Sequence, residues 1–412
     1  MMMPFLPISP ETPWLAPLAG FSDLPFRLLC REQGAAVACT EMISAKGVVY
    51  GVRNNKKARD GHSGSTDDLL ATCPEDSPLV VQLFGAEPEF LTEATELLCG
   101  RGFCWFDLNM GCPVPKVTKT GAGAALLREP ARAVAAAAAV FRSAGPGRAG
   151  CKLRLGWDAV SPVYIDLAKA LEDAGAAWIT LHPRYARQGF SGEADTEAWE
   201  KLVRAVSIPV LASGDLFRAK DALRCLSTGV SGVMFARGAM TNPAIFRRYH
   251  SLYRASAAQP SLFAEKRREN DASIEDGNDL EWRHRFREEE QTSPGGAREK
   301  ALPEIRRGAG KEGEPGGFVR EWSGHAGEFP DREELLSLIL RHAALACELT
   351  PGKRGHSPAL LKMRAVVPRY TRHLPGVKRL RPALARCRNW DEFSDIIRRF
   401  CNDTGEGPDG AA

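Results

Sequence analysis

The chain has 412 residues, of which 44% are hydrophobic and 26% are charged, proportions that are typical of soluble globular proteins. No run of about 18 apolar residues occurs, and residues 1–10 lack the basic and apolar regions of a secretory signal, so a transmembrane protein and a secreted protein are both disfavoured. The eleven cysteines are scattered, without a C-x-x-C pair, which disfavours a disulfide framework and a zinc ribbon and favours the reducing cytoplasm.

The net charge of +4 is unevenly distributed along the chain. Residues 331–403 hold 15 Lys or Arg and only 8 Asp or Glu. This excess favours a polyanionic partner for the C-terminal part, although a basic face that contacts only solvent is equally compatible with the charge alone.

Residues 1–257 repeat one pattern, in which a short apolar run is followed by a helix-like stretch. The predicted strands are Trp14–Pro17, Ala36–Thr40, Leu79–Leu83, Phe103–Leu108, Gly150–Leu153, Ala177–Leu181, Ile208–Ala212 and Ser231–Phe235. The predicted helices are Leu24–Gln33, Pro88–Gly100, Pro130–Ser143, Pro162–Ala174, Thr196–Ala205, Arg218–Leu226 and Pro243–Tyr253. Eight such units predict an α/β fold of the TIM (β/α)8 barrel type. The alternative is a doubly wound open sheet, but the G-x-G-x-x-G typical of that fold does not follow the first strand.

The composition changes after residue 257. Residues 258–330 contain ten glycines and six Ile, Leu or Val, too few apolar side chains to offset the entropy of ordering the chain, so they are predicted to form a disordered linker. Helical periodicity returns in residues 331–403, which are predicted to form a small basic helical domain. Residues 404–412 are expected to be a flexible tail.

Polar residues follow nearly every predicted strand, at the end where a TIM barrel places its active site. After strands 7 and 8, the small residues Ser213, Gly214 and Gly238 would let backbone N–H groups approach a phosphate, and Arg237 could neutralise it, although the Ser-Gly-Asp segment alone is more typical of a plain turn. Lys152 ends strand 5, where an ammonium either pairs with a buried carboxylate or faces an anionic cofactor.

Other strand ends carry further candidates, each with a structural alternative. Gln82 suits the edge of a heterocycle, but a hydrogen-bonded core glutamine is equally compatible. Cys112 lies in a loop rich in glycine and lysine, where a thiol can act as nucleophile or proton donor, although most cysteines are inert. His182 is either structural or a hydrogen-bond donor to a ligand. No metal-ligand spacing joins these residues, so no metal is expected.

At these positions the chain resembles the tRNA-dihydrouridine synthase family, over most of residues 13–257. The resemblance rests on the segments Ala16–Gly20, Asp23–Arg27, Val81–Gly85, Asp107–Pro113, Lys116–Val117, Gly121–Leu127, Lys152–Trp157 and Leu181–Arg184. The asparagine-x-glycine-cysteine-proline motif of Asn109–Pro113 is the most specific of these. The helical C-terminal segment is similar to the tRNA-binding domain of the family, through Lys362–Arg364 and Tyr370.

The resemblance implies an FMN-dependent oxidoreductase that reduces uridine in tRNA to 5,6-dihydrouridine, with NADPH or NADH as reductant, in a protein expected to be a cytoplasmic monomer. It implies that the flavin delivers hydride to C6 and that Cys112 delivers the proton to C5. The implied cofactor-binding residues are Pro17, Leu18, Ala19, Gln82, Lys152, His182, Ser213, Gly214, Asp215, Ala236 and Arg237. Asn109 would bind the uracil edge, and the candidate tRNA contacts are Lys116, Lys119, Arg154 and Arg184.

Two positions depart from the family pattern. Ser213 stands where the family has asparagine, and Ala236 stands where it has glycine. Backbone N–H donors survive both changes, so FMN binding is expected to persist. The linker of residues 258–330 is also unusual for the family. Two other functions stay open, namely an FMN-dependent barrel enzyme that acts on a small molecule, and an inactive RNA-binding module.

Overall fold

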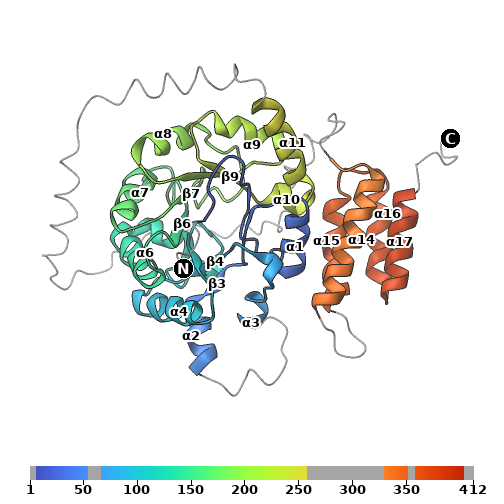
Figure 1. The fold of residues 1–412 in the computed structure, drawn as a ribbon, viewed down its shortest axis with the longest axis horizontal. Coiled ribbons are helices and arrows are strands. Elements are labelled where there is room, and N and C mark those ends of the chain that lie inside the picture. Colours follow the sequence, from blue (N-terminus) through green and yellow to red (C-terminus); the bar gives the residue numbers. More distant parts are fainter. Residues whose placement is uncertain (1–5, 54–65, 258–328, 351–357, 403–412) are drawn as a thin grey trace, which may run out of the picture. The chain divides into compact units, whose positions relative to one another are not determined.

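The computed structural model describes residues 6–53, 66–257, 329–350 and 358–402. The first part of the chain is a barrel of parallel strands surrounded by helices (Figure 1). The strands are β1 (Trp14–Leu15), β2 (Val37–Cys39), β3 (Ile43–Ser44), β4 (Leu79–Phe84), β5 (Trp105–Met110), β6 (Ala149–Arg154), β7 (Ile179–His182), β8 (Val210–Ser213) and β9 (Gly232–Phe235).

The strands form a closed ring. β1 pairs with β2 on one side and β9 on the other, and β2 also pairs with β4. The short strand β3 pairs with the carboxyl-terminal end of β4, whereas β2 pairs with its amino-terminal end. β2 and β3 therefore occupy one strand position, and the barrel has eight strand positions. The predicted TIM barrel is therefore confirmed, and the open sheet is excluded because such a sheet would have two unpaired edges. The first and last residues of each predicted strand differ by at most two positions from those of an observed strand.

Helices follow most strands and cover the outside of the barrel (Figure 1). They are α1 (Leu24–Glu32), α2 (Ala45–Arg53), α3 (Thr66–Leu69), α4 (Pro88–Gly100), α5 (Pro115–Thr118), α6 (Pro130–Ala144), α7 (Tyr164–Asp173), α8 (Glu197–Ala205), α9 (Ala219–Leu226), α10 (Arg237–Thr241) and α11 (Ile245–Ala257). The 3₁₀ helices are η1 (Pro74–Asp76) and η2 (Gly123–Arg128). The seven predicted helices all occur, and the sequence analysis missed α2 and the short helices α3, α5 and α10. None of the helices in the described ranges is both long and apolar enough to cross a membrane.

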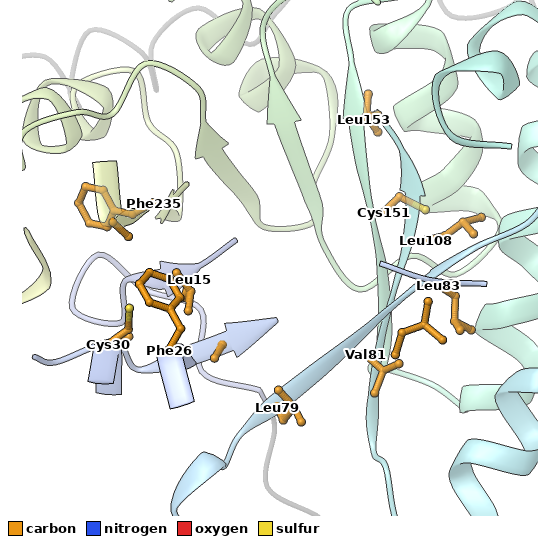
Figure 2. Close-up of a cluster of buried hydrophobic side chains, with 14 of the residues drawn as sticks. Leu15, Phe26, Cys30, Leu79, Val81, Leu83, Leu108, Cys151, Leu153 and Phe235 are labelled. Carbon is orange, nitrogen blue, oxygen red and sulfur yellow. The ribbon is translucent and has the colours of Figure 1, made fainter. Parts of the chain in front are cut away.

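Side chains along each strand alternate between two hydrophobic cores, because successive residues of a strand point to opposite faces. The outer core lies between strands and helices and includes Leu83, Leu108 and Phe235 (Figure 2). The inner core includes Trp14 and Trp178, whose rings meet edge to face with centroids 5.6 Å apart. Apolar side chains thus fill the amino-terminal half of the barrel interior, and polar side chains follow at the carboxyl ends.

Four helices form the C-terminal part: α14 (Arg332–Leu349), α15 (Pro358–Tyr370), α16 (Val377–Arg386) and α17 (Trp390–Asn402). Asp331 begins α14 by accepting a hydrogen bond from the N–H of Glu334 at 2.8 Å, as an N-cap residue does. The buried hydroxyl of Tyr370 joins α15 to α14 by a hydrogen bond of 2.9 Å with Nδ1 of His342. The predicted linker, apart from residues 329–330, and the predicted tail lie outside the described residues.

Helices α14 and α15 contact α1 of the barrel. The rings of His342 and Phe26 lie 5.7 Å apart, and Lys362 Nζ lies 2.5 Å from Oδ2 of Asp23. Asp23 is also the N-cap of α1, where its side chain accepts the N–H of Phe26. One carboxylate therefore both begins α1 and pairs with α15.

Candidate active site at the carboxyl ends of the strands

A layer of polar side chains occupies the carboxyl-terminal half of the barrel interior. Along each strand, these polar side chains alternate with apolar side chains that face outward. The polar ones are Gln82 on β4, Asp107 and Asn109 on β5, Lys152 and Arg154 on β6, Thr180 and His182 on β7, and Ser213 on β8. The strand register places Gln82 beside Asp107, Asn109 beside Lys152, and Arg154 beside His182. The strands therefore bring six of the predicted site residues into one layer, namely Gln82, Asn109, Lys152, Arg154, His182 and Ser213.

Asp107, Gln82 and Asn109 form a continuous hydrogen-bonded chain. The Nε2 of Gln82 donates to Oδ2 of Asp107 at 2.7 Å, and Nδ2 of Asn109 donates to Oε1 of Gln82 at 2.8 Å. The Oδ1 of Asn109 accepts the backbone N–H groups of Gly111 and Cys112, at 3.1 and 2.9 Å. This chain connects the buried interior of the barrel to the loop that carries Cys112.

The Cys112 loop is held from two further directions. The Nε of Arg154 donates to the carbonyl of Gly111 at 2.9 Å, and the N–H of Ala124 donates to the carbonyl of Cys112 at 3.0 Å. Gly123 lies against the loop so closely that a Cβ there would be 2.7 Å from the Cys112 carbonyl oxygen. The thiol is partly buried, and this desolvation raises the pKa of Cys112 above its ordinary value of 9.0, while Arg154 opposes that shift. The thiol is therefore protonated at neutral pH.

Two arginines share the carboxylate of Asp215 after β8. Arg184, only 2% exposed, donates to both carboxylate oxygens at 2.6 and 2.5 Å, and Arg237 donates to Oδ1 at 2.7 Å. Arg184 also donates to the carbonyls of Ser191 and Gly192. One negative charge thus accompanies two positive charges, so the cluster keeps a net positive charge.

His182 lies beside this cluster. Burial, followed by the charges of Lys152, Arg154, Arg184 and Arg237, lowers its pKa well below the ordinary value of 6.5. The imidazole is therefore neutral at physiological pH and can donate one hydrogen bond and accept another.

Phe190 covers the same cluster from the loop after β7. Its ring stacks on His182 with centroids 6.1 Å apart, and the guanidinium groups of Arg237 and Arg154 lie 4.4 and 5.6 Å from the ring centre. The ring is 57% exposed, which is unusual for a large apolar side chain. The cation–π contacts account for its position at the mouth of the barrel.

The mouth has the features that an anionic, heterocyclic cofactor such as FMN requires. Among the described residues, the ammonium of Lys152 forms no hydrogen bond or ion pair, and burial lowers its pKa from 10.5 to about 8. The buried hydroxyl of Thr180 on the next strand also lacks a partner in the described part of the chain. Gly214 leaves room for His182, since a Cβ at residue 214 would be 2.5 Å from the imidazole. Unpaired polar groups beside the turn that contains Gly214, with the net positive charge of Arg184 and Arg237 next to it, fit a bound phosphate and an electron-rich ring.

The match to known proteins agrees with this geometry. A family model described as dihydrouridine synthase matches residues 14–276, which is more than half of the chain. The chain belongs to the dihydrouridine synthase family.

Relatives of this family are found in several bacteria. A probable tRNA-dihydrouridine synthase of Treponema pallidum is 37% identical over 62% of this chain and 75% of its own length. The tRNA-dihydrouridine synthase B of Pseudomonas aeruginosa is 35% identical over 60% of this chain and 71% of its own. Among solved structures, morphinone reductase is 13% identical with a TM-score of 0.42, covering 58% of this chain and 85% of its own. That structural likeness is too low to carry an argument.

The remaining residues predicted from the family resemblance lie around the mouth. Pro17, Leu18 and Ala19 follow β1, where Leu18 closes a turn with the hydroxyl of Ser22 at 2.9 Å. Lys116 and Lys119 are exposed on and after α5. Ala236 and Arg237 stand where β9 passes into α10.

Asp107 and Thr180 lie in this polar layer, and Phe190 covers its edge, but all three were missed as candidates. Asp107 and Asn109 are two residues apart on one strand, so strand alternation could have identified Asp107 as facing the interior. The same rule applies to Thr180 and His182. Phe190 carries no comparable signal, because its position depends on the contact of its loop with arginines from other strands.

Proposed function

We propose that this protein is a tRNA-dihydrouridine synthase, which reduces the C5–C6 double bond of uridine in tRNA and uses FMN as its cofactor. One observation carries the proposal. Asn109 holds the Cys112 loop by two hydrogen bonds and is the register partner of Lys152, whose ammonium has no partner in the described residues. A proton-bearing thiol and an unpaired cation at one barrel mouth suit the reduction of a base held against a flavin.

The residues that would hold FMN divide into three groups. Lys152 and Gln82 would face the flavin ring, with the ammonium stabilising negative charge on the reduced ring. His182, Arg237 and the backbone of Ser213–Asp215 and Ala236 would hold the phosphate, and Pro17–Ala19 would line the strand 1 side. Bound FMN would supply hydride to C6 of the uracil, after its own reduction by NADPH or NADH.

Cys112 would supply the proton to C5 as a general acid. A thiol whose pKa is raised by burial keeps its proton at neutral pH, as an acid requires before the reaction. Asn109 would orient the uracil edge. Its oxygen already accepts from Gly111 and Cys112, and one of its two N–H groups donates to Gln82, while the nitrogen lies 3.8 Å from the sulfur of Met42. A uracil contact would therefore use the second N–H of this amide.

Contacts to the tRNA backbone would come from the exposed Lys116 and Lys119 and from the basic helices α15 and α16. Arg154 and Arg184 were predicted for this role, but both are about 2% exposed and donate to protein carbonyls or to Asp215. Arg154 and Arg184 would therefore attract the tRNA backbone only through their positive charge beneath the mouth.

A spectrum and a binding titration separate this function from the two alternatives. A tRNA-dihydrouridine synthase should purify as a yellow protein that absorbs at about 450 nm, and its affinity for tRNA should fall strongly as the salt concentration rises. A yellow protein with no tRNA affinity would support a small-molecule oxidoreductase. A colourless protein that takes up no added FMN would support an inactive RNA-binding module.

Substituting Gly214 with alanine should weaken FMN binding by about tenfold or more. The new Cβ would lie 2.5 Å from Cδ2 of His182, so the imidazole and the phosphate-binding turn must shift. Quenching of FMN fluorescence measures the dissociation constant. Gly175→Ala is the matched control, because its φ of +103° resembles the +117° of Gly214 while no described atom lies within 4 Å of the new Cβ. Equal FMN affinity in the two variants would contradict the assignment.

Alkylation of Cys112 by iodoacetamide should be slow at neutral pH and rise steeply above about pH 9, because only the thiolate reacts and burial raises the pKa of this thiol. Peptide mass spectrometry would resolve each site, with the exposed Cys347 as internal reference. A rate for Cys112 that is already maximal at pH 7 would show a thiolate, and would contradict the role of proton donor.

A further inference from the structure

We propose that Asp107 is a positioning residue for the Cys112 loop and that it acts through Gln82 and Asn109. The inference rests on the proposed function, in which Cys112 delivers the proton. Asp107 itself is buried in the barrel interior, 2% exposed, and its carboxylate accepts a hydrogen bond from Gln82 rather than from the described residues of the loop. Its influence has to pass through the two amides.

The two ends of the hydrogen-bonded chain each dictate an amide orientation. At the outer end, the backbone N–H groups of Gly111 and Cys112 can only donate, so the oxygen of Asn109 must face them and its nitrogen must face Gln82. At the inner end, an ionised Asp107 can only accept, so the nitrogen of Gln82 must face it and the oxygen must face Asn109. The two requirements agree at the central hydrogen bond between Gln82 and Asn109.

Without an acceptor at the inner end, only the N–H of Asn109 keeps the Gln82 amide in that orientation. A rotated amide would present its nitrogen to the nitrogen of Asn109, and two donors cannot bond to each other. Asn109 would then either lose its partner or turn away from the backbone of Gly111 and Cys112. The acceptor oxygen that Asp107 offers to Gln82 thus favours one arrangement of the loop out of two.

The groups around Asp107 support the ionised form only in part. Lys152 on β6 favours the charge, whereas burial opposes it and raises the pKa of Asp107 from 3.8 to about 7. Cys39 on β2 lies in the same interior, whereas Cys151 on β6 belongs to the outer core, and burial raises the thiol pKa values of both. The indole N–H of Trp178, which directly precedes β7, also favours the charge on Asp107, although neither this nitrogen nor Oδ1 of Asp107 makes a hydrogen bond of ordinary geometry in the described part of the chain. A residue that only filled this space would not require a buried carboxylate with one oxygen unsatisfied.

Three single variants and one double variant test the inference, with the alkylation rate of Cys112 relative to Cys347 as the readout. Asp107→Ala and Gln82→Met each break the chain, so the loop is released and we expect alkylation to be about tenfold faster. Asp107→Asn can still accept from Gln82 through its amide oxygen, so it should stay close to the wild-type rate. The double variant Asp107→Ala/Gln82→Met should match either single variant, because the two residues act in one chain.

Each outcome has a defined meaning. Wild-type alkylation in both Asp107→Ala and Gln82→Met, or additive effects in the double variant, would overturn the inference. If Asp107→Ala does not fold, Gln82→Met and Asp107→Asn decide alone. Retained tRNA reduction in Cys112→Ala would instead refute the proposed function, whereas loss in Cys112→Ala with unchanged alkylation in the Asp107 and Gln82 variants would refute only the role of Asp107.

Discussion

Substituting Cys112 with alanine should reduce the rate of dihydrouridine formation by about a hundredfold or more while FMN stays bound. General acid catalysis contributes roughly 10²–10⁴-fold, and the structure holds no other thiol on the loop that Asn109 and Arg154 position. Single-turnover reduction of unmodified tRNA by the pre-reduced enzyme measures the step directly. The absorbance of bound flavin, recorded in parallel, separates a lost proton donor from a lost cofactor.

Cys104→Ala is the matched control for this variant. Cys104 directly precedes the same strand β5 at the opposite end of the barrel, and its thiol lies 3.4 Å from the carbonyl oxygen of Gly102. Its substitution should leave the turnover rate unchanged. Full activity of Cys112→Ala would show that another group, or water, protonates C5.

Replacing Asp76 with alanine should lower the free energy of unfolding by about 3–5 kcal/mol, since it leaves the fully buried guanidinium of Arg27 without its counter-charge. Asp76 is 1% exposed, and its carboxylate accepts from Nε of Arg27 at 2.8 Å and from Nε of Arg31 at 3.0 Å. Both arginines lie on α1, so this carboxylate ties η1 to that helix. Urea denaturation followed by circular dichroism gives the change.

Asp67→Ala provides a comparison on the protein surface. Asp67 pairs with Arg101 at 2.9 Å, but the two side chains are 66% and 42% exposed, so water screens the pair. The expected loss is below about 1 kcal/mol. A loss in Asp76→Ala no larger than in Asp67→Ala would show that Arg27 finds other acceptors.

The architecture of the barrel was predictable because its signals are local and repeat eight times. Each strand is a short apolar run with a polar end, and the helices between them begin at residues such as Asp23, whose side chain caps α1. The residues of β3 could not be assigned, because a two-residue strand such as Ile43–Ser44 has no periodicity of its own.

The site was predictable only in part. The motif around Cys112 and the position of Lys152 pointed to the barrel mouth, and the structure brings both residues to it. The roles predicted for these side chains stay predictions. The ion pairs of Arg184 and Asp215 were beyond sequence reasoning, because they join loops 31 residues apart in the chain. Strand alternation could have predicted that Asp107 faces the interior, but the sequence does not show which residues a buried carboxylate pairs with.

The dihydrouridine content of tRNA tests the central claim most directly. Purified protein, FMN and NADPH are incubated with unmodified tRNA, and nucleosides are analysed by mass spectrometry for the gain of two hydrogen atoms at uridine. The proposed function predicts dihydrouridine that accumulates with time with the wild-type protein and is nearly absent with Cys112→Ala. A flavin-loaded wild-type protein that oxidises NADPH but leaves every uridine unchanged would contradict it.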